Sequence, residues 1–249
     1  MIQRSHRICV LCGAGLSAES GISTFRGKDG YWKQHRPEDL ATPEAFRRDP
    51  VLVWQWYRMR LDTVNNCQPN AAHYALIELS RNRLLEIITQ NVDGLQQRAN
   101  EDVHSGSPSA LPKVCELHGS LLWAHCSSCA KSYRQADLNQ EIPVPKCECG
   151  GQLRPSVIWF GESLDIDKLE FAEESAGKAD LLISIGTSAQ VWPAAGLLDL
   201  AIKMDIPLLE INPDKTPFSA VASIHMAEPA AKVLADIVAQ IKSQDRVNE

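Results

Sequence analysis

Four short apolar runs, each followed at once by small or polar residues, constrain the fold of this 249-residue chain more than any other feature. The runs are rich in Ile, Leu and Val, as in strands that are buried on both faces of a sheet, and helical patterns lie between them. They are residues 7–12, 84–89, 180–185 and 207–211. The pattern predicts an α/β protein with a Rossmann-like, doubly wound parallel sheet, whose ligand site lies at the carboxyl ends of the strands.

The helical patterns supply the layers that would cover this sheet. Thr42 followed by Pro43 is typical of a helix start, because a hydroxyl caps the first turn and proline fits its first position. Residues 50–64 and 70–79 have apolar side chains at helical spacing. Residues 230–241 predict a one-faced helix that closes the chain, and we expect the polar tail after it to fray.

Composition and charge exclude several classes of protein. The chain has 31 acidic against 25 basic residues and a formal net charge of −6, which argues against nucleic-acid binding through net charge. No apolar run approaches the roughly 18 residues that a membrane span needs. The first residues lack an apolar stretch before a cleavage site, so we expect a cytoplasmic protein that binds neither membranes nor nucleic acid.

Residues 13–18 (GAGLSA) fit a phosphate-binding pattern directly after the first predicted strand. Small residues there let backbone N–H groups approach a pyrophosphate at a helix N-terminus. The pattern alone is weak, and an ordinary tight turn is the alternative. The usual dinucleotide fold has an acidic strand end about 20 residues later, but residues 24–30 form a glycine-rich charged segment. We therefore expect a Rossmann variant with an early insertion rather than a hydride-transfer dehydrogenase.

Four of the eight cysteines form two close pairs. The first pair, Cys126 and Cys129, has two residues between its members. The second pair, Cys147 and Cys149, follows 17 residues later and has one residue between its members. Four thiolates make a closed tetrahedral zinc site without an open position for catalysis, whereas free or redox-active thiols are the alternative. We expect one structural Zn²⁺ ion. The other cysteines, expected to be core or loop thiols, are Cys9, Cys12, Cys67 and Cys115.

His118 comes immediately before the cysteine-rich segment, where a cleft beside the strand ends is expected. A lone histidine is usually a satisfied structural residue, and spacing alone does not raise it above that. Its place in the expected cleft makes it a candidate general base, because imidazole titrates near neutral pH.

Six motifs, in order along the chain, resemble those of the sirtuins, the NAD-dependent protein deacylases. They are GAGLSAESGISTFRG at 13–27, TQNVDGL at 89–95, ELHGS at 116–120, RPSVIWFGE at 154–162, GTS at 186–188 and INP at 211–213. The resemblance implies two domains. A Rossmann-like domain would comprise residues 1–30, 84–118 and 155–249. A smaller domain would comprise a helical insertion at 31–83 and a zinc-binding module at 119–154.

The resemblance also implies that NAD and an acylated-lysine protein or peptide meet between these domains. The residues implied to bind NAD are Gly13, Ala14, Gly15, Ala18, Phe25, Arg26, Gln90, Asn91, Val92, Asp93, Gly186, Thr187, Ser188, Asn212, Pro213, Asp214 and Ala230. The substrate peptide would pair along an edge made by Val157, Trp159, Phe160, Gly161 and Glu162. The implied catalytic residues are His118, Asn91 and Asp93.

Sirtuin chemistry implies that the acyl oxygen attacks C1′ of the nicotinamide ribose and that nicotinamide leaves. His118 would take a proton from a ribose hydroxyl, which then attacks the acyl carbon. Asn91 and Asp93 would orient the reacting groups. The products would be free lysine and O-acyl-ADP-ribose, and zinc would stay outside the chemistry.

Tyr57 and Arg60 lie three residues apart and share one face of the predicted helix at 50–64. In the sirtuin subgroup that removes succinyl and malonyl groups (class III), a Tyr-x-x-Arg pair at this place binds the carboxylate of the acyl group. Arginine offers a fixed fork to a carboxylate, and tyrosine adds a neutral donor. The alternative is an ordinary amphipathic helix with Arg60 in solvent and Tyr57 in the core.

Two positions depart from the family pattern, since Gln96 and Asn100 stand where His and Gly are usual. Glutamine replaces some hydrogen bonds of a neutral imidazole but cannot titrate. Two other functions remain open on the same fold: a non-catalytic NAD or ADP-ribose sensor, and a mono-ADP-ribosyltransferase. A sensor would lose His118 or Asn91, and this chain keeps both.

Overall fold

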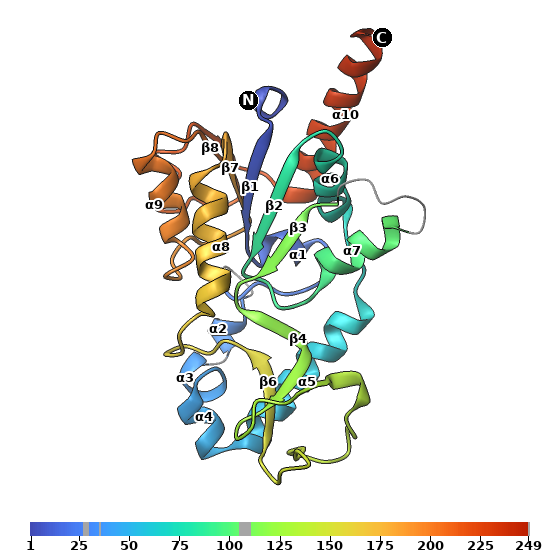
Figure 1. Cartoon of the computed structure of the whole chain (residues 1–249), viewed down its shortest axis with the longest axis vertical. Coiled ribbons are helices and arrows are strands. Elements are labelled where there is room, and N and C mark those ends of the chain that lie inside the picture. Colours follow the sequence, from blue (N-terminus) through green and yellow to red (C-terminus); the bar gives the residue numbers. More distant parts are fainter. Residues whose placement is uncertain (27–29, 35, 105–110, 249) are drawn as a thin grey trace.

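The computed structural model describes residues 1–26, 30–34, 36–104 and 111–248. Figure 1 shows two lobes stacked along the long axis of the molecule. The larger lobe holds a parallel sheet and both chain termini, and the smaller lobe holds short helices and a second sheet. The predicted α/β class, with a Rossmann-like sheet and a smaller cysteine-bearing part, is confirmed. Within the described residues, no helix is both long enough and apolar enough to cross a membrane.

Six strands form the larger sheet in the order β3-β2-β1-β7-β8-β9, and every neighbouring pair is parallel. The four predicted strands occupy its centre. Nearly all of their residues are buried, which explains why these strands are continuous apolar runs. The central strands are β1 (Arg7–Cys12), β2 (Leu84–Thr89), β7 (Leu181–Ile185) and β8 (Leu208–Ile211).

The two edge strands, β3 (Lys113–Glu116) and β9 (Ile224–Met226), were not predicted. Each is short and contains exposed or half-buried residues, so neither carries a recognisable apolar run. Strand β3 nevertheless matters for the site, because its carboxyl end leads directly to His118.

Helices cover both faces of the larger sheet (Figure 1). On one face, α6 (Ala71–Ser80) and α10 (Ala230–Asn248) close a core with the strands, and α7 (Leu95–His104) lies beside α6. On the other face, α8 (Ile166–Gly177) and α9 (Gly196–Lys203) close a second core. The sheet therefore lies between two hydrophobic layers, and its strand ends stay open to a ligand.

The last helix is longer than predicted. Helix α10 begins at Ala230, as expected, but continues to Asn248, so the expected fraying of the polar tail was wrong. The tail contains Lys, Gln and Arg, which have good helix propensity and extend a helix that its apolar face has already fixed.

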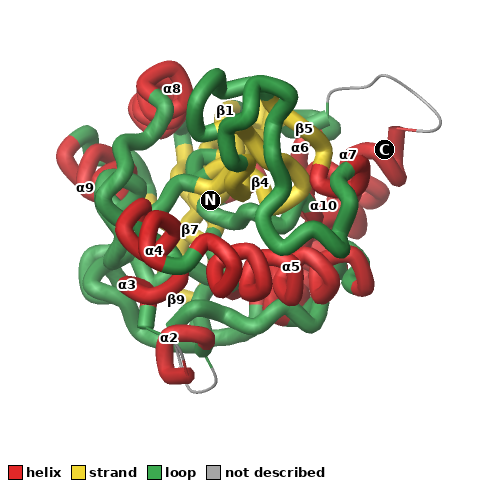
Figure 2. The backbone as a smooth tube through the Cα atoms, turned by 90° about the horizontal axis from the view of Figure 1, so that it is seen from below, coloured by secondary structure: helices red, strands yellow, loops and turns green. Residues whose placement is uncertain are grey.

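In the smaller lobe, helix α5 (Pro50–Asn66) packs on an antiparallel sheet of order β5-β4-β6. Figure 2 shows α5 running along this lower end of the molecule. The indole N–H of Trp54 donates to the backbone oxygen of Leu153 at 3.0 Å and ties the helix to the sheet. The strands are β4 (Gly119–Cys126), β5 (Ser132–Arg134) and β6 (Leu153–Val157).

Short elements fill the remaining chain. Thr42 Oγ1 accepts a hydrogen bond from Ala45 N at 3.0 Å and caps α4, which confirms the predicted helix start. The short helices are α1 (Gly15–Ala18), α2 (Tyr31–Gln34), α3 (Pro37–Leu40) and α4 (Pro43–Arg48), and two 3-10 turns cover Ile2–Arg4 and Gln135–Asp137.

The packing of α6 bears on where the domains divide. Ala72, Ala75 and Leu76 lie in the core between the larger sheet and α10, not in the core of the smaller lobe. The sequence-based division placed α6 in the helical insertion. We propose instead that the boundary lies between α5 and α6, because a helix belongs to the core in which its apolar face is buried.

His73 in the first turn of α6 makes the stability of the fold depend on pH. The imidazole is 1% exposed, and its Nδ1 accepts the backbone N–H of Asn70 at 3.1 Å in a capping box. Burial lowers the pKa of His73 to about 4 from its ordinary value of 6.5. The unfolded chain therefore binds more protons than the folded chain between these two pH values.

We expect His73 alone to contribute a fall of about 3 kcal/mol in the free energy of unfolding as the pH is lowered from 6.5 to 4, because each unit of pKa shift corresponds to about 1.4 kcal/mol. Urea titrations across this range measure the effect. His73→Gln is the matched control, since glutamine at this position keeps a capping acceptor but does not titrate. The same pH dependence in both proteins would show that another group is responsible.

Candidate active site

A cavity of about 880 Å³ lies between the strand ends of the larger sheet and the smaller lobe. The ends of the four predicted strands all reach it, through Gly13, Gln90, Gly186 and Asn212. The smaller lobe contributes helix α5 and the segment after β6. All NAD and substrate residues named from the sequence line this cavity, as does His118, with the exception of Asp93. Gly27 of the first motif lies outside the described residues.

Two glycine turns form the floor of the cavity where β1 and β7 end. A Cβ on Gly15 would lie 2.6 Å from the Cα of Gly186, and a Cβ on Gly13 would lie 2.9 Å from the Cα of Thr187. The backbone N–H of Gly15 donates to the oxygen of Gly186 at 2.8 Å. Side chains at these positions would push the two turns apart, so the glycines are needed for the backbones to meet beside the cavity.

A buried polar network fixes Asn91 at the end of β2. Its side-chain amide donates to the oxygen of Gly13 at 3.1 Å and to Ser17 Oγ at 3.2 Å. Ser17 Oγ in turn donates to Asp93 Oδ2 at 2.8 Å, and Asp93 Oδ1 accepts the N–H of Leu95. Asn91 therefore lines the cavity in a fixed orientation. Asp93 does not line this cavity but lines a smaller one, which Asn91 also borders. Burial raises the pKa of Asp93.

His118 lines the cavity, and one of its ring nitrogens makes a hydrogen bond with the backbone. Its Nδ1 is 3.2 Å from the backbone oxygen of Gln90. Because a carbonyl oxygen can only accept, Nδ1 carries the proton and Nε2 keeps its lone pair. Burial lowers the pKa of His118, so the ring is neutral at physiological pH. A neutral imidazole with a free Nε2 is able to act as a general base.

Arg60 is enclosed by aromatic rings. Its guanidinium carbon lies 4.7 Å from the ring centre of Trp56, 4.9 Å from that of Phe25, 5.6 Å from that of Tyr57 and 5.7 Å from that of Tyr31. The residue is 7% exposed, so the alternative of Arg60 in solvent is wrong. Burial lowers the pKa of Arg60. Among the described residues, no carboxylate lies within ion-pairing distance of it.

Tyr57 lies beside Arg60 on α5 and is also buried. Its hydroxyl oxygen accepts the indole N–H of Trp159 at 2.9 Å. Burial raises the pKa of Tyr57 to about 12, so its hydroxyl keeps its proton. The hydroxyl remains able to donate one hydrogen bond to a ligand in the cavity.

The segment after β6 also lines the cavity. The backbone N–H of Ile158 donates to the oxygen of His118 at 2.9 Å, and that of Phe160 donates to the oxygen of Ala41 at 2.9 Å. Glu162 accepts hydrogen bonds from the Arg154 guanidinium and from Trp159 N. Glu162 therefore holds the turn of this segment.

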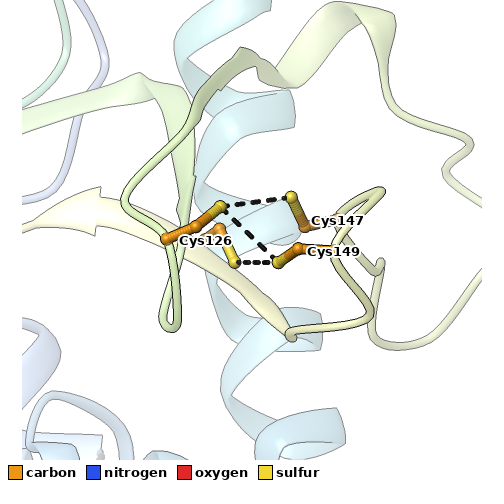
Figure 3. Close-up of side chains that lie close together, drawn as sticks. Cys126, Cys147 and Cys149 are labelled. Atoms are coloured by element: carbon orange, nitrogen blue, oxygen red, sulfur yellow. Dashed lines mark hydrogen bonds between the residues drawn. The ribbon is translucent and has the colours of Figure 1, made fainter.

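The four paired cysteines meet at one point in the smaller lobe, and Figure 3 labels three of them, Cys126, Cys147 and Cys149. Their Sγ atoms all lie within 4.8 Å of one another, and Cys126–Cys149, Cys129–Cys147 and Cys129–Cys149 are separated by 3.5–3.6 Å. These separations exceed the 2.05 Å of a disulfide. They are close to the edge of about 3.8 Å that four sulfurs at 2.3 Å from zinc define. The donor set and spacing fit structural zinc.

Two glycines explain why the C-x-C pair reaches the same point as the C-x-x-C pair. Gly150 has a φ of +86°, and its N–H closes a turn onto the oxygen of Cys147. A Cβ on Gly151 would lie 2.8 Å from Cys126 Sγ. The turn therefore brings the second pair directly against the first. The remaining cysteines, Cys9, Cys12, Cys67 and Cys115, are buried, as predicted.

Sequence reasoning missed several residues that line the cavity. Trp56 lies four residues before Arg60, so the helical spacing of α5 could have identified it. Trp192 is 63% exposed in the loop after β7, and no motif marks it. Lys215 and Thr216 come from the loop after β8, which the family motif covered only in part.

A Rossmann-like sheet, a cavity at its strand ends and a neutral histidine in that cavity are features of a nucleotide-dependent enzyme. The sequence pattern of the Sir2 family matches residues 13–193, and the chain belongs to this family.

Similar proteins agree with this membership over nearly the whole chain. A protein of Archaeoglobus fulgidus named NAD-dependent protein deacylase 1 is 45% identical over 97% of this chain and 95% of its own length. A solved Sir2 homologue in complex with NAD is 43% identical, with a TM-score of 0.87 over 98% of this chain and 92% of that one. A variant Sir2 with a deacetylated p53 peptide and 3′-O-acetyl ADP-ribose is 29% identical, with a TM-score of 0.86 over 96% and 95%.

Proposed function

We propose that this protein is an NAD-dependent protein-lysine deacylase that transfers the acyl group to ADP-ribose, giving nicotinamide, free lysine and O-acyl-ADP-ribose. The observation that carries the proposal is the neutral His118, whose Nε2 keeps its lone pair because Nδ1 donates to Gln90 O, in the same cavity as Asn91 and the glycine turns. Family membership and the names of its relatives support the same activity.

The chemistry divides among a few groups. The backbone of the turns at Gly13–Gly15 and Gly186 would bind the pyrophosphate, since it is exposed and needs no side chain to move. Asn91 would orient the nicotinamide ribose from its fixed position. His118 Nε2 would accept a proton from a ribose hydroxyl and so activate it toward the acyl carbon. The zinc site would hold the smaller lobe in shape and take no part in these steps.

We further propose that the preferred acyl groups include acidic ones such as succinyl and malonyl, in addition to acetyl. Arg60 is a buried cation that makes no salt bridge with a described residue, although the Asp93 carboxylate interacts with it electrostatically. It lines the cavity next to the Tyr57 hydroxyl. Burying a charge without a partner is unfavourable. A ligand carboxylate would supply that partner with charge-assisted hydrogen bonds.

We expect Arg60→Met to lower kcat/KM for a succinyl-lysine peptide by about 10- to 100-fold, because a charge-assisted hydrogen bond contributes about 1.5–3 kcal/mol. Activity on the matching acetyl-lysine peptide should change by less than about threefold. Nicotinamide release with each peptide measures both rates.

Arg58→Met is the control for this experiment, because Arg58 lies on the same helix but contacts Trp54 and Ile142 instead of the cavity. Unchanged succinyl selectivity in Arg60→Met would contradict acidic-acyl recognition. Nicotinamide release that does not require acyl-lysine would instead indicate an ADP-ribosyltransferase.

A further inference from the structure

Strand β8 contains a buried carboxylate that none of the chemistry above uses. Glu210 is 1% exposed and lies between Leu209 and Ile211, both in the hydrophobic core. Its neighbours across the sheet are Ser184 on β7 and His225 on β9. An ionised carboxylate in such a place needs strong hydrogen-bond partners to offset the loss of water.

The partners of Glu210 all come from the chain that follows β8. Thr216 Oγ1 donates to Glu210 Oε1, and Ser219 Oγ donates to Glu210 Oε2. His225 Nε2 lies 3.7 Å from Oε2. The carboxylate therefore holds the loop that follows β8, residues 212–219, against β8 itself.

The same two hydroxyls hold the backbone of the loop. Thr216 Oγ1 accepts the N–H of Phe218 at 3.1 Å, and Ser219 Oγ accepts the N–H of Thr216 at 2.8 Å. Each hydroxyl has one proton, and giving it to Glu210 turns the oxygen lone pairs toward these N–H groups. Phe218 then packs into the core beneath the loop.

The loop held in this way is one wall of the cavity. Residues 212–216 all line it. Asn212 Nδ2 also donates to the oxygen of Thr187 at 2.8 Å, which joins the loop to the turn after β7. Asn212 Oδ1 accepts the N–H of Asp214 at 3.1 Å. Glu210 itself does not line the cavity, so it acts on a ligand only through this loop.

We propose that Glu210 is a positioning residue for the dinucleotide. Its carboxylate fixes the loop at 212–219 and thereby sets the affinity of the cavity for the adenosine half of NAD, without contact with the reacting groups. The inference rests on the proposed function, because it is the family resemblance that implies that Asn212 and Asp214 of this loop bind the adenosine side of NAD.

Glu210→Gln tests the proposal, because glutamine keeps the size of the side chain but replaces one acceptor oxygen by a donor. One of the two hydroxyls then faces a donor, and the loop loosens. We expect the Kd for ADP-ribose, measured by calorimetry, and the KM for NAD each to rise about 10-fold. The kcat at saturating NAD and the KM for peptide should stay within about twofold, because His118 and Arg60 lie on other elements.

Two further variants complete the design. Ser219→Ala removes one hydrogen bond to Glu210 from a residue that does not line the cavity, and should raise the ADP-ribose Kd about threefold. Glu86→Gln is the matched control, since Glu86 is also a buried glutamate in a central strand but pairs with Arg7 away from the cavity. It should leave the ADP-ribose Kd unchanged.

An ADP-ribose Kd that is unchanged in Glu210→Gln would overturn the assignment. If Glu210→Gln does not fold, an unchanged ADP-ribose Kd in Ser219→Ala would overturn it. A fall in kcat with unchanged KM for NAD would also overturn it. Failure of the proposed function is distinguishable, because the wild-type protein would then bind no ADP-ribose or release no nicotinamide with acyl-lysine.

Discussion

Replacing His118 by alanine is expected to lower kcat for deacylation by about 1,000-fold, within the range that general-base catalysis contributes. The physical reason is that the two ring nitrogens have different hydrogen-bonding roles. Nδ1 donates to the oxygen of Gln90, which leaves Nε2 with a lone pair for the proton-accepting role that we propose. Steady-state nicotinamide release measures the loss.

The His118→Ala protein should still fold and bind metal, because His118 contributes a single backbone hydrogen bond through its side chain. Its thermal midpoint and zinc content are therefore informative. His73→Gln is the control, since it changes a buried histidine outside the cavity and should keep its activity. Near-normal deacylation by His118→Ala would show that another group is the base.

The pH profile of the wild-type protein checks the same residue. A base must be unprotonated to act, so activity is lost as the pH falls through the pKa of His118. Because burial lowers that pKa, kcat/KM should stay level down to pH values below about 6.5 and decline only on further acidification. His118→Ala should lose this dependence from its residual activity.

Removing the metal is expected to have the second large effect. Residues 127–152 of the smaller lobe contain little regular structure besides β5, and four cysteines hold this segment together. Structural zinc supplies folding free energy directly. We expect Cys147→Ser to lose its zinc and to lower the thermal midpoint by roughly 10 °C, as a loss of about 4 kcal/mol would do in a chain of this size.

Activity should fall with the metal, by about 10-fold or more, although the role that we propose for the ion is structural. The reason is that β6 pairs with β4 next to the cluster and continues into the segment at Val157–Glu162 that borders the cavity. Misplacement of catalytic walls by about 1 Å is enough for losses of this size.

Cys115→Ser is the matched control, because Cys115 is also buried but lies in the larger lobe beside α8. It should keep one zinc ion per chain, measured by atomic absorption on the purified protein. One zinc ion per chain retained in Cys147→Ser would contradict the four-cysteine site.

Much of the site could be predicted because its residues lie next to strong local patterns. The strand-end turns follow apolar runs, and the runs are apolar because parallel strands are buried on both faces. The cysteine pairs were recognisable for a similar reason, since metal-binding thiolates need close spacing on turns. His118 was placed by its motif, although the strand that leads to it, β3, was not predicted.

Other parts of the site could not be predicted because they depend on contacts between distant segments. The cage around Arg60 combines α5 with Phe25 and Tyr31 from the preceding segment. Asp93 was named as a cavity residue, yet the network with Ser17 draws it behind Asn91. No local pattern states which side chain will face a cavity and which will support it.

The sequence by itself determined the α/β class, the turns after the four central strands that line the cavity, and the four cysteines of the zinc site. Each of these follows from burial or spacing over a few residues. Only the tertiary structure decided that α6 joins the larger core, that Arg60 is buried without a salt bridge to a described residue, and that Glu210 holds the loop after β8. These outcomes depend on which polar groups remain to satisfy one another once the hydrophobic layers have packed, and that is settled by the whole fold.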